Sequence, residues 1–348
     1  MSVRKAIVID GSYGEGGGQI VRTSLSLSMI TGCPFRLINV RANRSKPGLR
    51  PQHLTAVRAS ARVCGARVDG AELGAREFHF TPGPVHGGEY QFHIGTAGAT
   101  TLVLETLLPP LARAERDTRL MITGGTHVPW SPPFHYLEQV FLPSLDQLGF
   151  RCECSIGRWG WYPKGGGEIT ALMKSAGPHA VVYLHHPFEL ERITAISASS
   201  RLPEHVRVRQ RQQVRSRLQK AGLQADIALM DVPALSPGSF VFLCAHGKGA
   251  VAGFSSLGAR GKPAERVADE AVDELLRFLD SRSALDPYLA DQILIYLAMI
   301  PGTHRIATSA VTQHLLTNAW VTEQFLPVRF EVVGALHEPG LVVKRDRQ

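Results

Sequence analysis

The sequence predicts an α+β protein built from three repeated βαβαββ units, with a smaller α/β domain inserted into the third. Strand-length apolar segments alternate with helical segments in one recurring order, and that order is interrupted once, at about 187–283. No apolar run is long enough to span a bilayer. We therefore expect a large repeat domain at 1–186 and 284–348, and an inserted small α/β domain at 187–283.

Each unit consists of a strand, a helix, a strand, a helix and two further strands. The first is expected at 6–9, 20–31, 35–41, 51–64, 66–69 and 77–81. The second is expected at 90–94, 99–113, 119–123, 132–148, 151–156 and 168–174. The third supplies helices at 287–299 and 311–325, and strands at 304–307, 329–333 and 340–344. The insert is expected to hold strands at 193–198, 224–230, 240–245 and 250–254, and helices at 204–221 and 263–280. The repeat is one of pattern, because no residue-level repeat accompanies it.

The composition is that of an ordinary soluble globular protein. Of the 348 residues, 44% are hydrophobic and 20% are charged, so the chain is able to bury a sizeable core. The net charge of +8 and the pI near 9.4 indicate an anionic partner such as a nucleic acid or a nucleotide, although many basic proteins bind neither.

Five scattered cysteines favour a reducing compartment, and the N-terminal residues do not have the pattern of a signal peptide. We therefore expect a cytoplasmic protein with no membrane association. Cys152 and Cys154 are expected on one face of a strand. Because no second Cys/His pair lies at zinc spacing, we interpret both thiols as packing groups.

A candidate nucleophile lies near the end of the chain, in the stretch 312–318. Val311, Leu315 and Ala319 fall on one stripe at helical spacing, and His314 lies beside that stripe. A neutral imidazole near a helix start is a good nucleophile for phosphorus, since it has a free ring nitrogen and the helix-end amides favour a phosphate beside it. The alternative is an ordinary histidine on a core-facing helix.

A glycine-rich turn at 14–19 precedes the first helix. Its glycines allow the backbone to approach a phosphate closely, although no Gly-Lys-Ser/Thr follows, so the turn is not a Walker loop. Glu15 within the turn is able to hold a divalent cation that is bound to phosphates, and Arg22 lies two helical turns further on. The alternative is a tight turn with a surface Glu and Arg.

Four more stretches suit a nucleotide or an RNA. The loop at 41–53 is basic, the aromatic-Pro-Lys-Gly-Gly-Gly turn at 158–168 carries rings that can stack on a base, and 286–292 begins a helix with Tyr and Gln side chains that suit adenine. Exposed loops and an ordinary helix start are the alternatives. The basic helix at 204–221 predicts either a solvated face or a contact with an RNA backbone.

Together these stretches resemble the RNA 3′-terminal phosphate cyclase family, in the right order and over essentially the whole chain. The matching runs are Gly-Glu-Gly-Gly-Gly-Gln-Ile at 14–20, Lys-Pro-Gly-Leu at 46–49 before Gln-His-Leu at 52–54, Gly-Gly-Thr-His at 124–127, and Tyr-Pro-Lys-Gly-Gly-Gly-Glu-Ile at 162–169. The resemblance implies three βαβαββ units, like the C-terminal domain of translation initiation factor three, with a small thioredoxin-like insert.

The resemblance also implies a ligase-type reaction that uses ATP and an RNA with a 3′-phosphate end. His314 attacks the α-phosphate of ATP and expels pyrophosphate, and the histidine-AMP passes AMP to the RNA 3′-phosphate. The neighbouring 2′-hydroxyl then closes a 2′,3′-cyclic phosphate and releases AMP. The covalent histidine divides one difficult transfer into easier ones. Family members are often homodimers.

By position, the resemblance implies that Glu15 holds Mg²⁺ or Mn²⁺. Three side chains would steady phosphates: Arg22, Arg41 and Gln52. Seven residues would contact the nucleotide: Glu105, Pro129, Tyr288, Leu289, Ala290, Asp291 and Gln292. The sequence departs from the family pattern at Glu105, where glutamine is usual, and at Trp159, where a basic residue is usual. A carboxyl at the first position loses an amide donor and would change nucleotide choice or metal binding.

Three other functions compete with this interpretation. A non-catalytic cyclase-like RNA-binding or ribosome-assembly protein would share the fold but lack the nucleophile, and His314 is present here. An enolpyruvyl transferase would use the same repeated units, but the single insert and the ATP-type contacts disfavour it. The third rival is a basic RNA-binding protein without activity.

Overall fold

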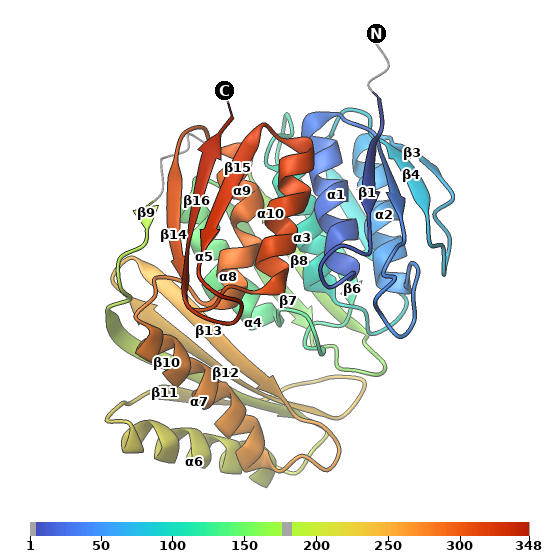
Figure 1. Ribbon diagram of the computed structural model, residues 1–348. Helices are drawn as coiled ribbons and strands as arrows, with labels where there is room; N and C mark the ends of the chain where they lie inside the picture. The colour runs from blue at the N-terminus through green and yellow to red at the C-terminus, as the bar shows by residue number, and fades with distance from the viewer. Residues whose placement is uncertain (1–4, 176–182, 348) are drawn as a thin grey trace.

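A computed structural model describes residues 5–175 and 183–347. It is a mixed α+β structure in which helices fill the centre of a large domain and three small sheets lie around them, with a smaller α/β domain below (Figure 1). The large domain combines residues from both ends of the chain, and the smaller one lies between them in sequence.

The three outer sheets share one strand order and one set of directions. In each, the first two strands pair in parallel, the second pairs antiparallel with the fourth, and the fourth pairs antiparallel with the third. The first sheet, in the order β1-β2-β4-β3, contains β1 (Ile7–Asp10), β2 (Phe35–Ile38), β3 (Arg67–Asp69) and β4 (Phe78–Thr81). The second, in the order β5-β6-β8-β7, contains β5 (Glu89–His93), β6 (Thr118–Gly124), β7 (Cys152–Arg158) and β8 (Gly167–Met173). The third, in the order β15-β16-β14-β9, contains β9 (Tyr183–Leu184), β14 (His304–Thr308), β15 (Val328–Val333) and β16 (Gly340–Asp346).

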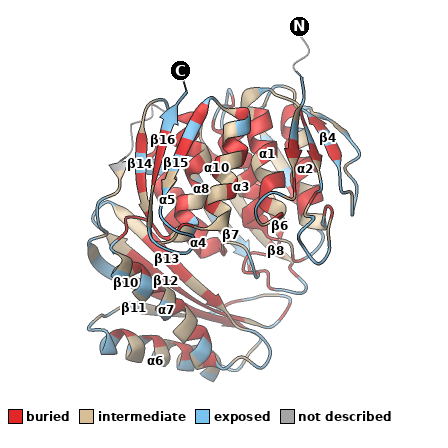
Figure 2. Cartoon of the chain, in the orientation of Figure 1, coloured by how far each residue is buried: buried red, intermediate tan, exposed pale blue. Residues whose placement is uncertain are grey.

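The central helices are mostly those that the apolar spacing predicts. They are α1 (Gly18–Thr31), α2 (Pro51–Cys64), α3 (Thr100–Leu111) and α10 (Gln313–Phe325), joined by the shorter segments α4 (Phe134–Tyr136), η1 (Leu137–Phe141), α5 (Leu142–Gln147), α8 (Pro287–Gln292) and α9 (Leu294–Met299). Buried residues are concentrated along these helices (Figure 2).

Two helices predicted as continuous are interrupted. The segment expected at 132–148 contains the π-helical turn η1, which is followed by Pro143. Proline lacks the N–H that an α-helical ladder needs, so a change of hydrogen-bond pattern before it has a local cause. The helix expected at 287–299 is divided at Ile293 into α8 and α9. The strand β9, which has only two residues, is not predicted by the sequence pattern.

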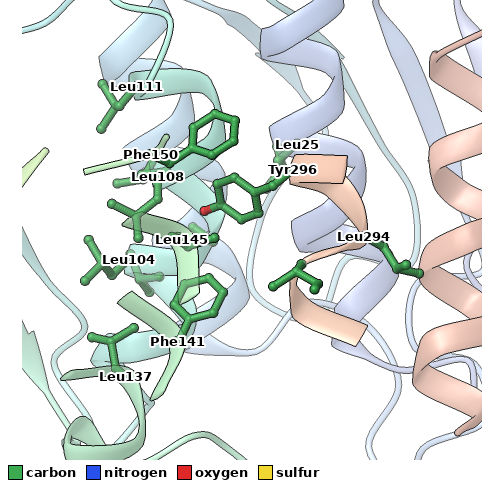
Figure 3. Close-up of a cluster of buried hydrophobic side chains, with 14 of the residues drawn as sticks. Leu25, Leu104, Leu108, Leu111, Leu137, Phe141, Leu145, Phe150, Leu294 and Tyr296 are labelled. Atoms are coloured by element: carbon green, nitrogen blue, oxygen red, sulfur yellow. The ribbon is translucent and has the colours of Figure 1, made fainter. Parts of the chain in front are cut away.

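Leucines of α3 meet aromatic rings from other elements at the centre of the large domain (Figure 3). Tyr296 lies edge-on to Phe150 and Phe141, with ring centroids 4.9 and 6.0 Å apart respectively. All three rings are 1% exposed or less, so this cluster joins the second and third sheets through one apolar interior.

The inserted segment folds as a sheet with two helices on one face (Figure 1). Its elements are β10 (Leu190–Ser200), α6 (His205–Lys220), β11 (Asp226–Asp231), β12 (Gly238–Gly247), β13 (Ala250–Leu257) and α7 (Ala264–Ser281), with strand order β11-β10-β12-β13. Residues facing α6 and α7 form a separate apolar core, whereas Phe240, Phe242 and Cys244 on the opposite face join the core of the large domain.

Half of the basic side chains of α6 form ion pairs within the insert. Arg209 makes a two-point ion pair with Glu265, and Arg217 contacts Asp269 and Asp273 of α7 at 2.7 and 2.6 Å. Arg207 is paired in the same way, with Glu204 and Asp231. Arg211, Arg215 and Lys220 have no such acidic partner among the described residues. The ion pairs favour the reading of α6 as a structural and solvated helix over a dedicated RNA contact.

No helix in the described part of the chain is long and apolar enough to cross a membrane. Cys152 and Cys154 lie on the same face of β7 and pack against the large core, as predicted.

Two buried tyrosines predict opposite responses to the loss of a hydroxyl. The Tyr296 hydroxyl is buried with no hydrogen-bond partner among the described residues, whereas the Tyr136 hydroxyl donates to Asp286 at 2.8 Å. We expect Tyr296→Phe to raise the free energy of unfolding by about 1 kcal/mol, because it removes an unsatisfied polar atom. Tyr136→Phe should lower the free energy of unfolding by about 1–3 kcal/mol. Urea denaturation of both variants checks this, and a loss of stability in Tyr296→Phe would contradict it.

Candidate active site

His314 is the second residue of α10, and the helix start holds it in place. The Thr312 side chain caps the helix by accepting a hydrogen bond from the Leu315 amide at 3.0 Å. Leu315 is fully buried and anchors the first turn, while the His314 side chain is 43% exposed. The imidazole is therefore accessible, while the backbone that carries it is held in place.

The glycine-rich turn lies directly against this helix start. Gly14 has φ +59°, and a Cβ there would be 2.5 Å from Thr317 Oγ1. Gly16 has φ +55°, and a Cβ there would be 2.7 Å from Asn43 Nδ2. Both positions need glycine for their backbone angle and for the lack of space. The turn thus fits between α10 and the loop at 41–50.

Glu15 joins these two neighbours. Its Oε2 lies 3.1 Å from His314 Nε2 and 2.6 Å from Arg44 Nη2. The carboxylate is 35% exposed. A predicted metal ligand and a predicted nucleophile, 299 positions apart in the sequence, are therefore in direct contact.

Asp291 is the centre of a hydrogen-bond network next to the His314 backbone. Gln19 Nε2 donates both to Asp291 Oδ1 at 2.9 Å and to the His314 carbonyl at 3.0 Å. Asn318 Nδ2 donates to the side chain and the backbone carbonyl of Asp291, and Thr23 donates to Asn318 Oδ1 at 2.6 Å. Burial raises the pKa of Asp291 to about 6, although the charges of His314 and Arg22 oppose the rise. Asp291 is thus mainly ionised at neutral pH and holds α1, α8 and α10 together.

Arg22 is under the electrostatic influence of two carboxyls, Glu105 and Asp291. Burial lowers its pKa while Glu105 and Asp291 oppose that change, and a guanidinium keeps its proton in any case. Burial raises the pKa of Glu105 to about 8, against the field of Arg22. Glu105 Oε1 is buried with no hydrogen-bond partner in the described structure. Because Asp291 already balances the arginine, Glu105 is protonated at neutral pH and acts as a neutral acid.

A group of arginines surrounds a neutral histidine beside the glycine-rich turn. Burial and the charges of Arg22, Arg41 and Arg50 lower the pKa of His53 to about 3. His53 Nε2 lies where a Cβ on Gly18 would be only 2.1 Å away, so the ring packs against the start of α1. This arrangement concentrates positive charge where an anion can bind.

Two of the predicted phosphate ligands, Arg41 and Gln52, already form hydrogen bonds within the protein. Arg41 has φ +53° and uses Nη1 to bind the carbonyls of Lys46 and Gly48, at 2.7 and 3.0 Å. Gln52 Oε1 accepts from the Ala99 amide at 3.0 Å, at the start of α3. The remaining guanidinium nitrogens of Arg41 and the amide nitrogen of Gln52 are the groups that stay available for a ligand.

The residues predicted to cradle the nucleotide form α8. Asp286 caps this helix by accepting from the Tyr288 and Leu289 amides, both at 2.9 Å, and it also accepts from Gly253 of the insert at 3.3 Å. Leu289 and Ala290 are fully buried, so only their backbone could meet a ligand. Tyr288 is 45% exposed, and its hydroxyl lies 3.2 Å from Glu274 of the insert.

Two further predicted contacts have distinct surroundings. Gln292 Oε1 is buried and has no hydrogen-bond partner among residues 5–175 and 183–347. Pro129 lies on an exposed loop after β6. That loop joins the site through Val128, which packs against Ala97 and Ala99 near the Gln52 contact.

The aromatic turn at 158–168 does not offer most of its rings to a base. Trp159 and Trp161 are 5% and 2% exposed, and His127 stacks on Trp159 at 4.0 Å. His127 Nε2 in turn lies 2.9 Å from His135 Nδ1 in the same buried cluster. The interpretation of the two tryptophans as base-stacking residues was wrong, because tertiary packing buries them. Tyr162 in the same turn is 69% exposed.

The family model described as RNA 3′-terminal phosphate cyclase matches residues 13–332. The chain belongs to this family. An RNA 3′-terminal phosphate cyclase of Methylococcus capsulatus is 46% identical over 343 residues, which cover 96% of this chain and 95% of the relative. That of Pyrococcus furiosus is 44% identical over 336 residues, covering 97% and 98%. Among solved structures, an EPSP synthase from Acinetobacter baumannii is 12% identical, and the match covers 99% of this chain and 66% of that structure with a TM-score of only 0.33.

Family resemblance in the sequence did not assign every residue of this site. Gln19 fixes the His314 carbonyl, Arg44 holds Glu15, and His53 packs under the turn. All three lie within or next to the quoted motifs, and this position was the one sequence feature that could have pointed to them. Their partners were not visible, because each contact crosses between elements distant in sequence.

The site contains one carboxylate suited to a cation rather than a full ligand cage. In the described part of the chain, no group of three or more His, Cys, Asp or Glu side chains could hold a metal ion. Glu15 is a hard oxygen donor, half-exposed beside the arginine group. That fits Mg²⁺, which usually takes one or two carboxylates together with substrate phosphates.

The protonation of Glu105 predicts a pH-dependent stability. Its folded pKa of about 8 lies above its ordinary 4.5, so its contribution is present below 4.5 and is lost as the pH rises through 8. Relative to Glu105→Gln, the wild type should lose up to about 1.4 kcal/mol of unfolding free energy per pH unit in this window. Urea denaturation at several pH values checks this, with the exposed Glu72→Gln as the control. Parallel pH curves for wild type and Glu105→Gln would contradict it.

Proposed function

We propose that this protein converts the 3′-terminal phosphate of an RNA into a 2′,3′-cyclic phosphodiester, using ATP and a covalent histidine-AMP. Membership of the cyclase family indicates the overall reaction. The observation that carries the mechanism is the 3.1 Å contact between His314 Nε2 and Glu15, on a half-exposed imidazole at a helix start. The nucleophile and the predicted cation ligand thereby face one space.

The first step forms a bond between His314 Nε2 and the α-phosphorus of ATP, and breaks the bond to the β-phosphate so that pyrophosphate leaves. An oxygen of the RNA 3′-phosphate then attacks the same phosphorus, and the imidazole departs. In the third step the 2′-hydroxyl loses its proton and attacks the RNA phosphorus, and AMP leaves. AMP is needed because a phosphate monoester otherwise has no good leaving group.

The residues around His314 suit these steps by position and charge. Gln19 and the capped helix start fix the backbone that carries His314, and Glu15 contacts its imidazole, so less conformational freedom is lost when the ring attacks. Arg22, Arg41 and Gln52 border the region where the phosphates would lie and would stabilise the charge that develops on them. Mg²⁺ or Mn²⁺ held by Glu15 would supply Lewis-acid stabilisation of the phosphates.

The adenosine is proposed to lie along α8, between Tyr288 and Pro129. Asp291 and Gln292 would offer polar groups, Leu289 and Ala290 only backbone. The neutral carboxyl of Glu105 would donate one hydrogen bond where glutamine in the family donates from an amide. This substitution therefore alters the donor without adding a charge at neutral pH.

A non-catalytic RNA-binding or ribosome-assembly role is the alternative. It does not account for an accessible histidine that contacts a carboxylate beside a glycine-rich turn.

We also propose a domain organisation, a cellular location and an oligomeric state. The domain at 1–186 and 284–348 would consist of three initiation-factor-like units, and the insert at 187–283 would be thioredoxin-like, consistent with its strand order. Five free cysteines suit a cytoplasmic location, and a homodimer stays a prediction.

The mechanism predicts a covalent adduct. Incubation with α-labelled ATP and Mg²⁺ or Mn²⁺ should leave acid-labile label on the wild type, and His314→Ala should remove both the label and cyclisation. His205→Ala, at an exposed position of the insert, is the matched control and should be labelled normally. Label on His314→Ala would show that another residue is the nucleophile.

The contact between Glu15 and His314 predicts a second effect on the same assay. Glu15→Gln keeps the size of the side chain but weakens the hold on a cation and the polarisation of the phosphates. We expect adduct formation to slow by on the order of 10²-fold, as for the loss of one group that stabilises a transition state. Glu72→Gln serves as the control. An unchanged rate of labelling would exclude Glu15 from the step.

A further inference from the structure

Trp130 violates two structural preferences at once. It lies in the loop between β6 and α4, where its side chain is 97% exposed and its backbone has φ +59°. A bulky residue at positive φ is strained, and an exposed indole forgoes the burial that stabilises most tryptophans. Residues that break local preferences without a structural gain are expected at functional positions.

The loop holds this ring outward on a fixed backbone. The Ser131 hydroxyl donates to the Val128 carbonyl at 3.0 Å, and the Phe134 amide donates to the Thr126 carbonyl at 2.9 Å. Thr101 of α3 donates to the Pro132 carbonyl at 2.8 Å. Val128 itself is 5% exposed and anchors the loop in an apolar cluster. The exposure of Trp130 is therefore built into the fold.

A second exposed ring belongs to the neighbouring turn. Tyr162 is 69% exposed, and its turn packs against the turn at 95–98, since a Cβ on Gly165 would be 2.7 Å from the Thr96 carbonyl. The Trp130 loop packs on the same turn through Val128. A Cβ on Gly125 would touch both the Ala97 carbonyl and the Val128 side chain, so these two groups lie close together. The loops that carry the two exposed rings thus pack on one small turn.

This turn leads directly to the proposed phosphate site. The Ala99 amide, at its end, donates to Gln52 Oε1 at 3.0 Å. Gln52 is followed by His53, whose pKa is lowered by burial and by three arginines. Lys164 is exposed beside Tyr162. Two open aromatic surfaces and positive charge therefore border the place where an RNA 3′-phosphate would react.

We propose that Trp130 and Tyr162 form an open stacking platform for bases at the 3′ end of single-stranded RNA. The proposal rests on the proposed function and adds the location of the RNA. A ring that is 97% exposed does not line a concave pocket of the kind that encloses a small ligand. Single-stranded nucleic acids, in contrast, stack successive bases on open aromatic side chains above a basic surface.

Binding is tested without catalysis, using a short single-stranded RNA with a 3′-phosphate and no ATP. Trp130→Ala should weaken the RNA Kd about tenfold, the value of one base–aromatic stack, and Tyr162→Ala should weaken it similarly. Trp130→Phe should keep most of the affinity but lose the RNA-induced quenching of tryptophan fluorescence. Trp320→Phe, which alters a ring stacked on Tyr13, should retain that quenching. Val333→Ala, an exposed apolar truncation on β15, should bind RNA like the wild type.

Labelling by α-labelled ATP separates this proposal from the mechanism. Trp130→Ala should form the His314 adduct at the wild-type rate. An unchanged RNA Kd in Trp130→Ala would overturn the platform, and a parallel loss of labelling would assign the ring to ATP instead. If the wild type binds RNA through Trp130 but forms no adduct, the histidine-AMP mechanism fails while the platform stands.

Discussion

The site depends on the close approach of the glycine-rich turn to the first turn of α10. At Gly14 any Cβ would collide with Thr317, so the turn reaches α10 only because it lacks side chains there. That approach brings Glu15 to His314. The helix cap at Thr312 and the hydrogen bond from Gln19 to the His314 carbonyl then fix the backbone from which the imidazole projects. Backbone sterics therefore determine which side chains meet.

Charge balance is the second constraint on this region. Arg22 cannot lose its proton, and burying it requires a carboxylate nearby. Asp291 supplies one and also accepts hydrogen bonds from Gln19 and Asn318, so its charge is well compensated. Glu105 can then remain protonated. This division of roles explains how a second carboxyl is accommodated in the same electrostatic environment as Arg22 and Asp291.

Side chains of the proposed site form hydrogen bonds with the insert. Asp286 begins α8 and accepts hydrogen bonds from Tyr136 of the large domain and from Gly253 of the insert. Tyr288, at the first turn of α8, reaches Glu274 of the insert. The proposed adenosine-binding helix is thus held by contacts from both domains.

The sequence by itself determined the mixed α+β class, the position of almost every strand and helix, the motifs that identify the family, and the candidate nucleophile His314. These follow from local spacing and from short glycine-rich runs, which depend only on neighbours along the chain. It did not indicate the break at Ile293, the burial of Trp159 and Trp161, the clamp from Gln19, or the exposure of Trp130. Those features come from contacts between segments far apart in sequence, such as the packing of His127 on Trp159. Only the tertiary structure decides such contacts, because burial and charge depend on which surfaces meet once all the elements have packed.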